Sequence, residues 1–203
     1  MKTNVSSLLR LGALLLSGAA SLFATTVIAP EFDDLVGKAD YVVRATVKSV
    51  TSEWRVSGGQ RHIFTKVELT VNEVITGTPP NPLVLDLLGG VVGDEELRVE
   101  GTPKFKVGEE DVLFVQANGR QFYPLVGIMH GKYPVERDAK TGREYIARSN
   151  GAPLYNEKEV VEPMEAAVAG SAPAGQQPLS PAAFAAKIRE THAALQLRQR
   201  VQH

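Results

Sequence analysis

The four histidines are the side chains of this sequence best suited to moving protons near neutral pH, because an imidazole titrates at about pH 6.5. They stand at positions 62, 130, 192 and 203, and none has the H-E-x-x-H spacing of a zinc-binding helix. His130 lies between Gly127 and Gly131 in an expected loop, where functional residues tend to gather. No nucleophile or carboxylate accompanies it in sequence, so a structural role is the favoured interpretation.

Carboxylates are the second group that could do chemistry, and they occur as Asp94-Glu95-Glu96 and Glu109-Glu110-Asp111. Such clusters can bind calcium, but these lack the alternating ligand order of a calcium loop, which favours solvated loops. The glycine-rich run that precedes Asp94 contains no P-loop lysine and opens no helix. The sequence therefore predicts no metal site and no cofactor.

Nucleophilic catalysis finds no support either. There is no cysteine, which excludes thiol catalysis, disulfides, cysteine-ligated zinc and lipid attachment through cysteine. No G-x-S-x-G elbow is present. No catalytic residue is predicted, and the residues expected to bind a ligand at the rim of the domain are Gly90, Gly93, Asp94, Glu95 and His130.

The amino-terminal 24 residues have the layout of a secretory signal peptide. Lys2 and Arg10 flank a polar start, an apolar run follows, and cleavage is expected after Ala24. Of the 22 basic residues two lie in this segment, which leaves 20 against 23 acidic residues and a net charge of −3. Such a chain attracts neither nucleic acid nor anionic lipid by bulk charge. We expect an exported protein, periplasmic or extracellular, whose mature chain has no membrane span.

The stretch from Asp40 to Gly77 organises the domain. Apolar residues alternate with polar ones along residues 41–48 and again along 62–72, on either side of a polar interruption at 51–61 that contains Gly58-Gly59. This period of two predicts two long antiparallel strands with one solvated face.

Further strands are expected at 82–88, 97–99, 111–116, 121–126, 132–137 and 143–147, with a bulge or loop at 89–94 and a hairpin turn at Asn118-Gly119. A short helix is expected at 30–39. About eight short strands without intervening helices predict a mainly β fold, an OB-like small antiparallel barrel over residues 25–155, with a β-sandwich as the alternative.

The carboxyl-terminal part of the chain changes in composition. Residues 156–179, rich in alanine, glycine and proline, are expected to be a flexible linker. Residues 180–203 are expected to form an amphipathic helix, with Ser180 as its cap and Phe184, Ile188 and Leu195 along one side. That apolar stripe is suited to docking on the barrel or on a partner.

Ala39-Asp40, Val43-Arg44-Ala45 and Val74-Ile75-Thr76-Gly77, with Phe105–Val115 later, resemble the opening and closing strands of the tissue-inhibitor-of-metalloproteinases and netrin-module group. The resemblance covers about 75 residues with gaps and implies an OB-fold domain of a secreted protein. Inhibitors of that group chelate a protease zinc through an amino-terminal cysteine, which this chain lacks. The resemblance therefore implies a barrel that binds something, without that mechanism; the chain also looks like a bacterial exported protein of uncharacterised type.

Three hypotheses follow. The leading one is an exported, non-enzymatic binding module that engages another envelope or secreted protein, for example a protease, through the barrel rim. The second is a hydrolase or metal-dependent enzyme in which His130 lies beside Asp94 or Glu96. The third is a structural protein that assembles through its carboxyl-terminal helix.

Overall fold

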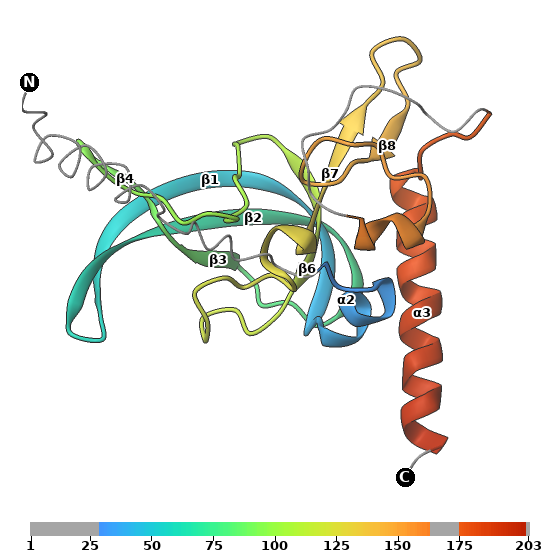
Figure 1. Ribbon diagram of the computed structural model, residues 1–203, viewed down its shortest axis with the longest axis horizontal. Helices are drawn as coiled ribbons and strands as arrows, with labels where there is room; N and C mark the ends of the chain where they lie inside the picture. Colours follow the sequence, from blue (N-terminus) through green and yellow to red (C-terminus); the bar gives the residue numbers. More distant parts are fainter. Residues whose placement is uncertain (1–28, 163–174, 202–203) are drawn as a thin grey trace, which may run out of the picture.

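The computed structural model describes residues 29–162 and 175–201, and the expected signal peptide, residues 1–24, lies outside them. The described chain is mainly β, with a six-stranded antiparallel sheet, a two-stranded sheet and two α-helices (Figure 1). The elements are α2 (Phe32–Lys38), β1 (Tyr41–Ser57), β2 (Gln60–Gly77), β3 (Leu83–Leu88), β4 (Gly90–Val92), β5 (Glu95–Leu97), β6 (Glu110–Val115), the 3-10 helix η1 (Ile128–Gly131), β7 (Lys132–Arg137), β8 (Glu144–Ile146), the 3-10 helix η2 (Glu157–Val161) and α3 (Pro181–Val201).

The β1–β2 hairpin dominates the sheet and curves away from the body of the domain (Figure 1). Its strands pair as far as Ser57 and Gln60, so the polar interruption expected at 51–61 is wrong. Cross-strand contacts explain why the polar half still pairs. Ser52 and Thr65 are hydrogen-bonded at 2.9 Å, Lys66 lies 2.9 Å from Glu53, and the Arg61 guanidinium lies 4.8 Å from the Trp54 ring centroid. Only the turn Gly58-Gly59 separates the strands.

The six-stranded sheet has the order β3-β2-β1-β6-β7-β8, and each of its faces covers its own core. The inner core lies within the curve of the hairpin and comprises Tyr41, Val43, Ala45, Val47, Val67, Leu69, Leu83, Leu85, Leu87, Leu113, Val115 and Leu125. The outer core includes Val42 of β1, Phe114 and Tyr133 of the sheet, and residues of both helices. Val42 and Val43 are both fully buried, so the expected solvated face is wrong for this end of the hairpin, because helices cover it.

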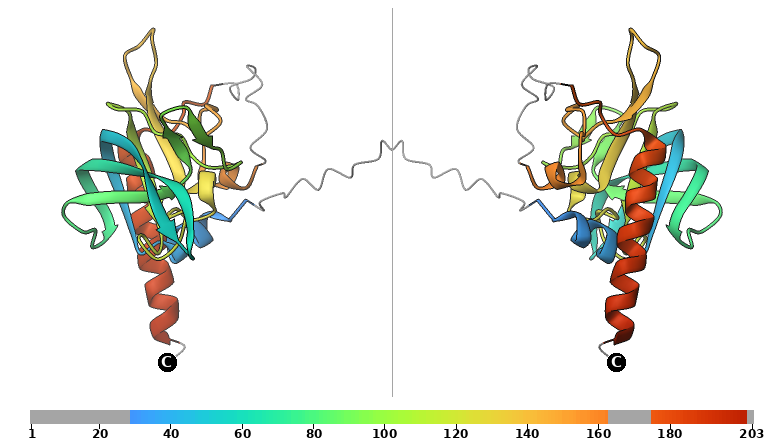
Figure 2. Two further views of the ribbon diagram at one scale, coloured as in Figure 1. Left: turned by 90° about the vertical axis from the view of Figure 1, so that its left-hand side faces the viewer. Right: turned by 90° about the vertical axis from the view of Figure 1, so that its right-hand side faces the viewer.

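Helix α3 packs on the outer face of the sheet in the same chain (Figure 2). The Ala183 N–H donates to Ser180 Oγ at 3.2 Å, which confirms the expected cap. The Phe184 ring lies 5.2 Å from Tyr133, 5.8 Å from Phe32 and 6.1 Å from Phe114, between ring centroids. The first half of the helix therefore contributes an aromatic cluster to the outer core, while its last turns extend past the sheet (Figure 1).

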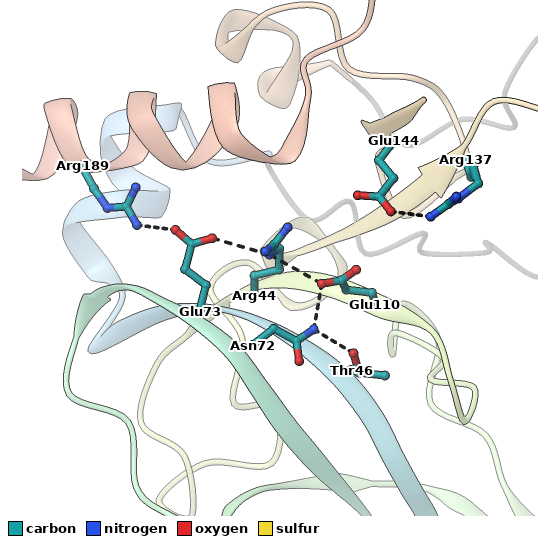
Figure 3. Close-up of polar contacts among 8 residues, drawn as sticks. All are labelled: Arg44, Thr46, Asn72, Glu73, Glu110, Arg137, Glu144 and Arg189. Atoms are coloured by element: carbon teal, nitrogen blue, oxygen red, sulfur yellow. Dashed lines mark hydrogen bonds and ion pairs between the residues drawn. The ribbon is translucent and has the colours of Figure 1, made fainter. Parts of the chain in front are cut away.

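A polar network next to this core links α3 to three strands (Figure 3). Arg189 of α3 pairs with Glu73 of β2, whose carboxylate also lies 3.5 Å from Nε of Arg44 in β1. Glu110 of β6 lies 3.5 Å from the same nitrogen and accepts a hydrogen bond of 2.8 Å from Asn72. Because these side chains are partly exposed, the network orients the helix more than it stabilises the fold.

Three expected local structures are wrong. Residues 121–126 form no return strand: Asn118 donates to the Val84 carbonyl at 2.8 Å and the Ala117 N–H donates to Asp40 at 2.7 Å, so side chains hold this loop against β3 and β1. Only one bridge, Val115–Leu125, remains of the expected pair. The segment 89–94, expected as a bulge or loop, instead contains β4. The strand expected at 97–99 is also wrong, because β5 spans Glu95–Leu97 and ends there.

The described ends of the segment expected as a linker lie against the domain. Val160 of η2 is fully buried in the outer core. The Leu179 N–H donates to the Leu154 carbonyl at 2.8 Å, and its own carbonyl accepts from Ile146 at 2.8 Å. Residues 163–174 lie outside the described chain, so the linker between these two points stays a prediction.

Substitution Phe184→Ala tests how far α3 contributes to the fold. Emptying this fully buried site is expected to lower the free energy of unfolding by about 3 to 5 kcal/mol in urea denaturation. Leu197→Ala, on the exposed part of the same helix, is the control and should change it by less than about 0.5 kcal/mol. Equal effects would contradict the docking of α3 on the sheet.

Candidate binding pocket

An open pocket of about 730 Å³ lies between the curved half of the β1–β2 hairpin and the chain from Gly89 to Lys106. We call it the hairpin pocket. Its apolar lining includes Val50, Val67, Leu87, Val91, Leu97 and Phe105. Val67, Leu87 and Phe105 also belong to or pack against the inner core, so the pocket is the place where that core opens to solvent. An open apolar pocket of this size can bury an apolar group of a ligand or partner.

Strand β4 forms one wall of the pocket because Gly90 permits a very close approach to the hairpin. Gly90 has φ of +136°, and a Cβ there would clash with the side-chain oxygens of Ser52 and Thr65. Thr65 Oγ1 in turn donates to the Gly89 carbonyl at 2.6 Å, and the Gly89 N–H donates to the Ile63 carbonyl at 2.8 Å. These bonds fix the start of β4 on the hairpin, and any larger residue at 90 would push the wall outwards.

A further part of the lining is the irregular segment from Arg98 to Lys106, which leads from β5 to β6. Arg98 lies 2.6 Å from Glu96 in an exposed ion pair. Lys104 and Lys106 are exposed, and their ammonium groups have no hydrogen bond or ion pair with any described residue. Glu100 on the same segment is also exposed and has no ion pair with a described residue. The three basic lining residues, Arg98, Lys104 and Lys106, against the two acidic ones, Glu96 and Glu100, leave the lining with a net charge of +1, which favours an anionic group on whatever binds.

Lys132 and Asp111 form a buried ion pair next to Phe105. Lys132 Nζ lies 2.9 Å from Asp111 Oδ1, 3.3 Å from Glu109 and 5.4 Å from the Phe105 ring centroid. Asp111 is fully buried and Lys132 nearly so. Burial raises the pKa of Asp111 to about 6, although the charge of Lys132 lowers it. The pair neutralises two charges that would otherwise be isolated below the pocket.

The structure separates the residues predicted to bind. Gly90 lines the hairpin pocket, and Gly93, Asp94 and Glu95 lie at the exposed turn of the β4–β5 hairpin, so these four share one element. Glu96, named in the enzymatic hypothesis, lines the pocket too.

His130 lies elsewhere, in η1, and is not among the lining residues. It is almost fully buried, and its Nδ1 has no hydrogen-bond partner in the described chain. Burial, followed by the charge of Arg148, lowers the pKa of His130. The nearby charge that acts on this imidazole is thus a cation, which favours the neutral ring.

Sequence reasoning missed the apolar lining and the buried pair. The sequence does contain one signal for the lining. The apolar residues of β1 stand at odd-numbered positions as far as Val47, and the next one, Val50, stands at an even-numbered position. The register shifts at this point, with Lys48 as the extra residue. Such a β-bulge turns Val50 and Ser52 towards the pocket. No comparable signal marks Lys132 and Asp111, which meet only because β6 pairs with β7.

A second open pocket, of about 670 Å³, lies where β2 connects to β3 and includes residues 77–83. Its charged lining residues, Lys48 and Glu68, already pair with each other at 2.6 Å. None of the predicted binding residues lines it. We therefore take the hairpin pocket as the candidate site.

No protein-family model and no curated protein matches this chain. Within the described residues, no group of three or more His, Asp or Glu side chains is arranged to hold a metal ion. In the same part of the chain, no helix combines the length and hydrophobicity needed to cross a membrane.

The pKa of Asp111 makes its contribution to stability depend on pH. Because the folded value, about 6, exceeds the ordinary 3.8, this contribution is complete below pH 3.8 and is lost as the pH rises through 6. At about 1.4 kcal/mol per pKa unit, the loss is at most about 3 kcal/mol.

We expect a carboxyl-carbon NMR titration to find Asp111 well above the other aspartates. Lys132→Met should raise its pKa further, because the cation that lowers it is removed. Lys140→Met, on an exposed turn, should leave it unchanged. A titration midpoint near 4 in the unsubstituted protein would contradict this account of the buried pair.

Proposed function

We propose that this protein is an exported, non-enzymatic binding module that engages another envelope or secreted protein through the hairpin pocket. The observation that carries the proposal is the opening of the inner core beside exposed apolar side chains. Val91 is 55% exposed and Val50 37% exposed, and both line the pocket. Burial of these side chains against an apolar group of a partner would provide the driving force for binding.

We propose further that the inner core is enclosed as an OB-like barrel. Two contacts support closure beyond the six-stranded order. The Leu88 N–H, on the free side of β3, donates to the Phe122 carbonyl at 3.1 Å, and Val115 of β6 bridges to Leu125. Residues 122–125 thus contact both β3, the first strand in the order of the sheet, and β6, the fourth, on either side of the inner core.

Export is proposed from the amino-terminal sequence, with its charged start, apolar run and small residue at Ala24. The two separate cores allow the domain to fold without disulfides, which is compatible with export. A protease is one partner class, on the strength of the resemblance described above. Zinc chelation by an amino-terminal cysteine is not part of the proposal, because the chain has no cysteine.

No specific contact among the described residues supports the enzymatic hypothesis or the assembly hypothesis. No described ion pair or hydrogen bond joins His130 to Asp94 or Glu96, so the enzymatic alternative stays a prediction. Assembly through α3 also stays a prediction. The stripe expected for it, at Phe184 and Ile188, is fully buried within the chain, which leaves Leu197 and Val201 as the exposed apolar residues of that helix.

Partner capture with matched variants tests the proposal. We expect the mature chain to retain a protein from native periplasm or medium at physiological salt, and Val91→Asp to reduce retention at least tenfold, or about 1.4 kcal/mol. Val107→Asp is the control, because Val107 is 67% exposed and outside the pocket. Failure to capture any protein, or equal loss in both variants, would contradict binding through the pocket.

A further inference from the structure

Strand β1 has an unpaired edge beside the hairpin pocket. On the side away from β2, β6 pairs with β1 from Tyr41 to Thr46. The last backbone bonds on that side are at Val47, whose N–H donates to Glu109 and whose carbonyl accepts from Gly108, both at 2.9 Å. From Lys48 to Ser57 no described residue bonds to this edge. We call this stretch the free edge; such an edge offers a template for another strand.

The pairing of β2 with β3 shows which way the backbone N–H and C=O groups of β1 point. The Ile63 carbonyl accepts from Gly89 and therefore points towards β3. Ile63 pairs with Trp54, so the N–H and C=O groups of Trp54 point away from β2, towards the free edge. The same alternation gives Ser52 and Val50 outward-pointing groups. Thr51 and Glu53 point inwards and bond to β2.

The residues with outward-pointing backbone groups also have side chains on the pocket side. Val50 and Ser52 line the hairpin pocket, and Lys104, Phe105 and Lys106 lie on a second segment of the chain. This segment precedes Gly108, where the chain first bonds to β1, and it lines the same pocket as Val50 and Ser52. A strand placed on the free edge would therefore direct alternate side chains into the apolar pocket.

We infer that the partner binds by strand addition: an extended segment of the partner protein pairs with β1 from Val50 to Trp54, places an apolar side chain in the hairpin pocket and presents a neighbouring carboxylate to Lys104 and Lys106. This inference rests on the proposed function. In this mode of recognition, main-chain hydrogen bonds supply affinity and side-chain pockets supply specificity.

Charge argues against a second copy of β1 as the occupant. The carboxylate on this strand, Glu53, is already bonded to Lys66 at 2.9 Å and lies 3.3 Å from Arg55. A second β1 would thus bring no free carboxylate to the two lysines, and its Lys48 and Arg55 are already paired with Glu68 at 2.6 Å and Asp86 at 2.7 Å. A partner segment with an unpaired acidic residue fits the surface better.

Hydrogen exchange of the full mature chain tests the free edge directly. Before binding, the amides of Val50, Ser52 and Trp54 should exchange much faster than those of Thr51 and Glu53, which bond to β2. Random ten-residue peptides displayed on phage provide the probe, and we expect the selected sequences to alternate apolar residues and to contain an acidic one. Adding such a peptide should slow the three fast amides at least tenfold.

Backbone methylation of the selected peptide separates strand addition from other binding. Methyl groups on alternate peptide amides should abolish binding, whereas methyl groups on the intervening amides should leave it within twofold. Lys104→Gln with Lys106→Gln should weaken binding about tenfold, and Lys140→Gln, on an exposed turn, should not. A peptide that binds with no such alternation would overturn strand addition but leave the pocket as the binding site.

Two further outcomes are distinguishable. If dodecanoate, tested alone, binds in the pocket and no peptide is selected, the site takes a small amphiphile and the inference is wrong. If neither peptide nor protein is retained and Val91→Asp has no effect, the proposed function fails together with the inference.

Discussion

The fold depends on the backbone pairing of β1, which has neighbours on both edges at its start and cores on both faces. Between Tyr41 and Val47 this strand bonds to β2 and to β6, and its side chains alternate between the inner and outer cores. The other strands of the six-stranded sheet are attached to β1 in sequence, β3 through β2 on one side and β7 and β8 through β6 on the other. The helices are needed because the outer face of β1, with Val42 fully buried, would otherwise expose apolar surface.

The same strand creates the candidate site where its second neighbour leaves. Beyond Val47 the chain that precedes β6 turns away, while β2 continues alongside β1 to the end of the hairpin. One edge and one face of the hairpin thus open at the same place. The bulge at Lys48 turns Val50 towards that opening. The pocket and the free edge are consequences of a single change in strand pairing, and for that reason they form one surface.

Two buried charges near the pocket are accommodated by pairing with each other. Lys132 and Asp111 neutralise each other below the pocket, and Phe105 covers them. A buried pair of this kind contributes little net stability compared with apolar residues, but loss of one member leaves a buried charge that is costly. It also keeps the floor of the pocket free of an isolated charge, so that the apolar lining and the lysines on its wall define what binds.

The sequence alone determined the elements whose signals are local. Alternation predicted β1, β2 and β3, although β1 continues to Ser57 beyond the expected polar interruption, and a continuous apolar run predicted β6. The Ser180 cap with its apolar stripe predicted α3, because these patterns depend on neighbouring residues. Tertiary structure decided the rest. The hairpin expected at Asn118-Gly119 does not form, because the Asn118 side chain donates to the carbonyl of Val84, 34 residues away in the chain.

The site belongs to that second class. Gly90 was predicted to bind and does line the pocket, whereas His130 is buried in η1 and does not. A loop flanked by glycines looks the same in sequence whether it faces solvent or the core. The apolar residues of the pocket were indistinguishable from core residues, because they continue the inner core and differ only in lacking a covering strand. Whether a strand edge is covered is set by partners distant in sequence, and so only the folded chain could show it.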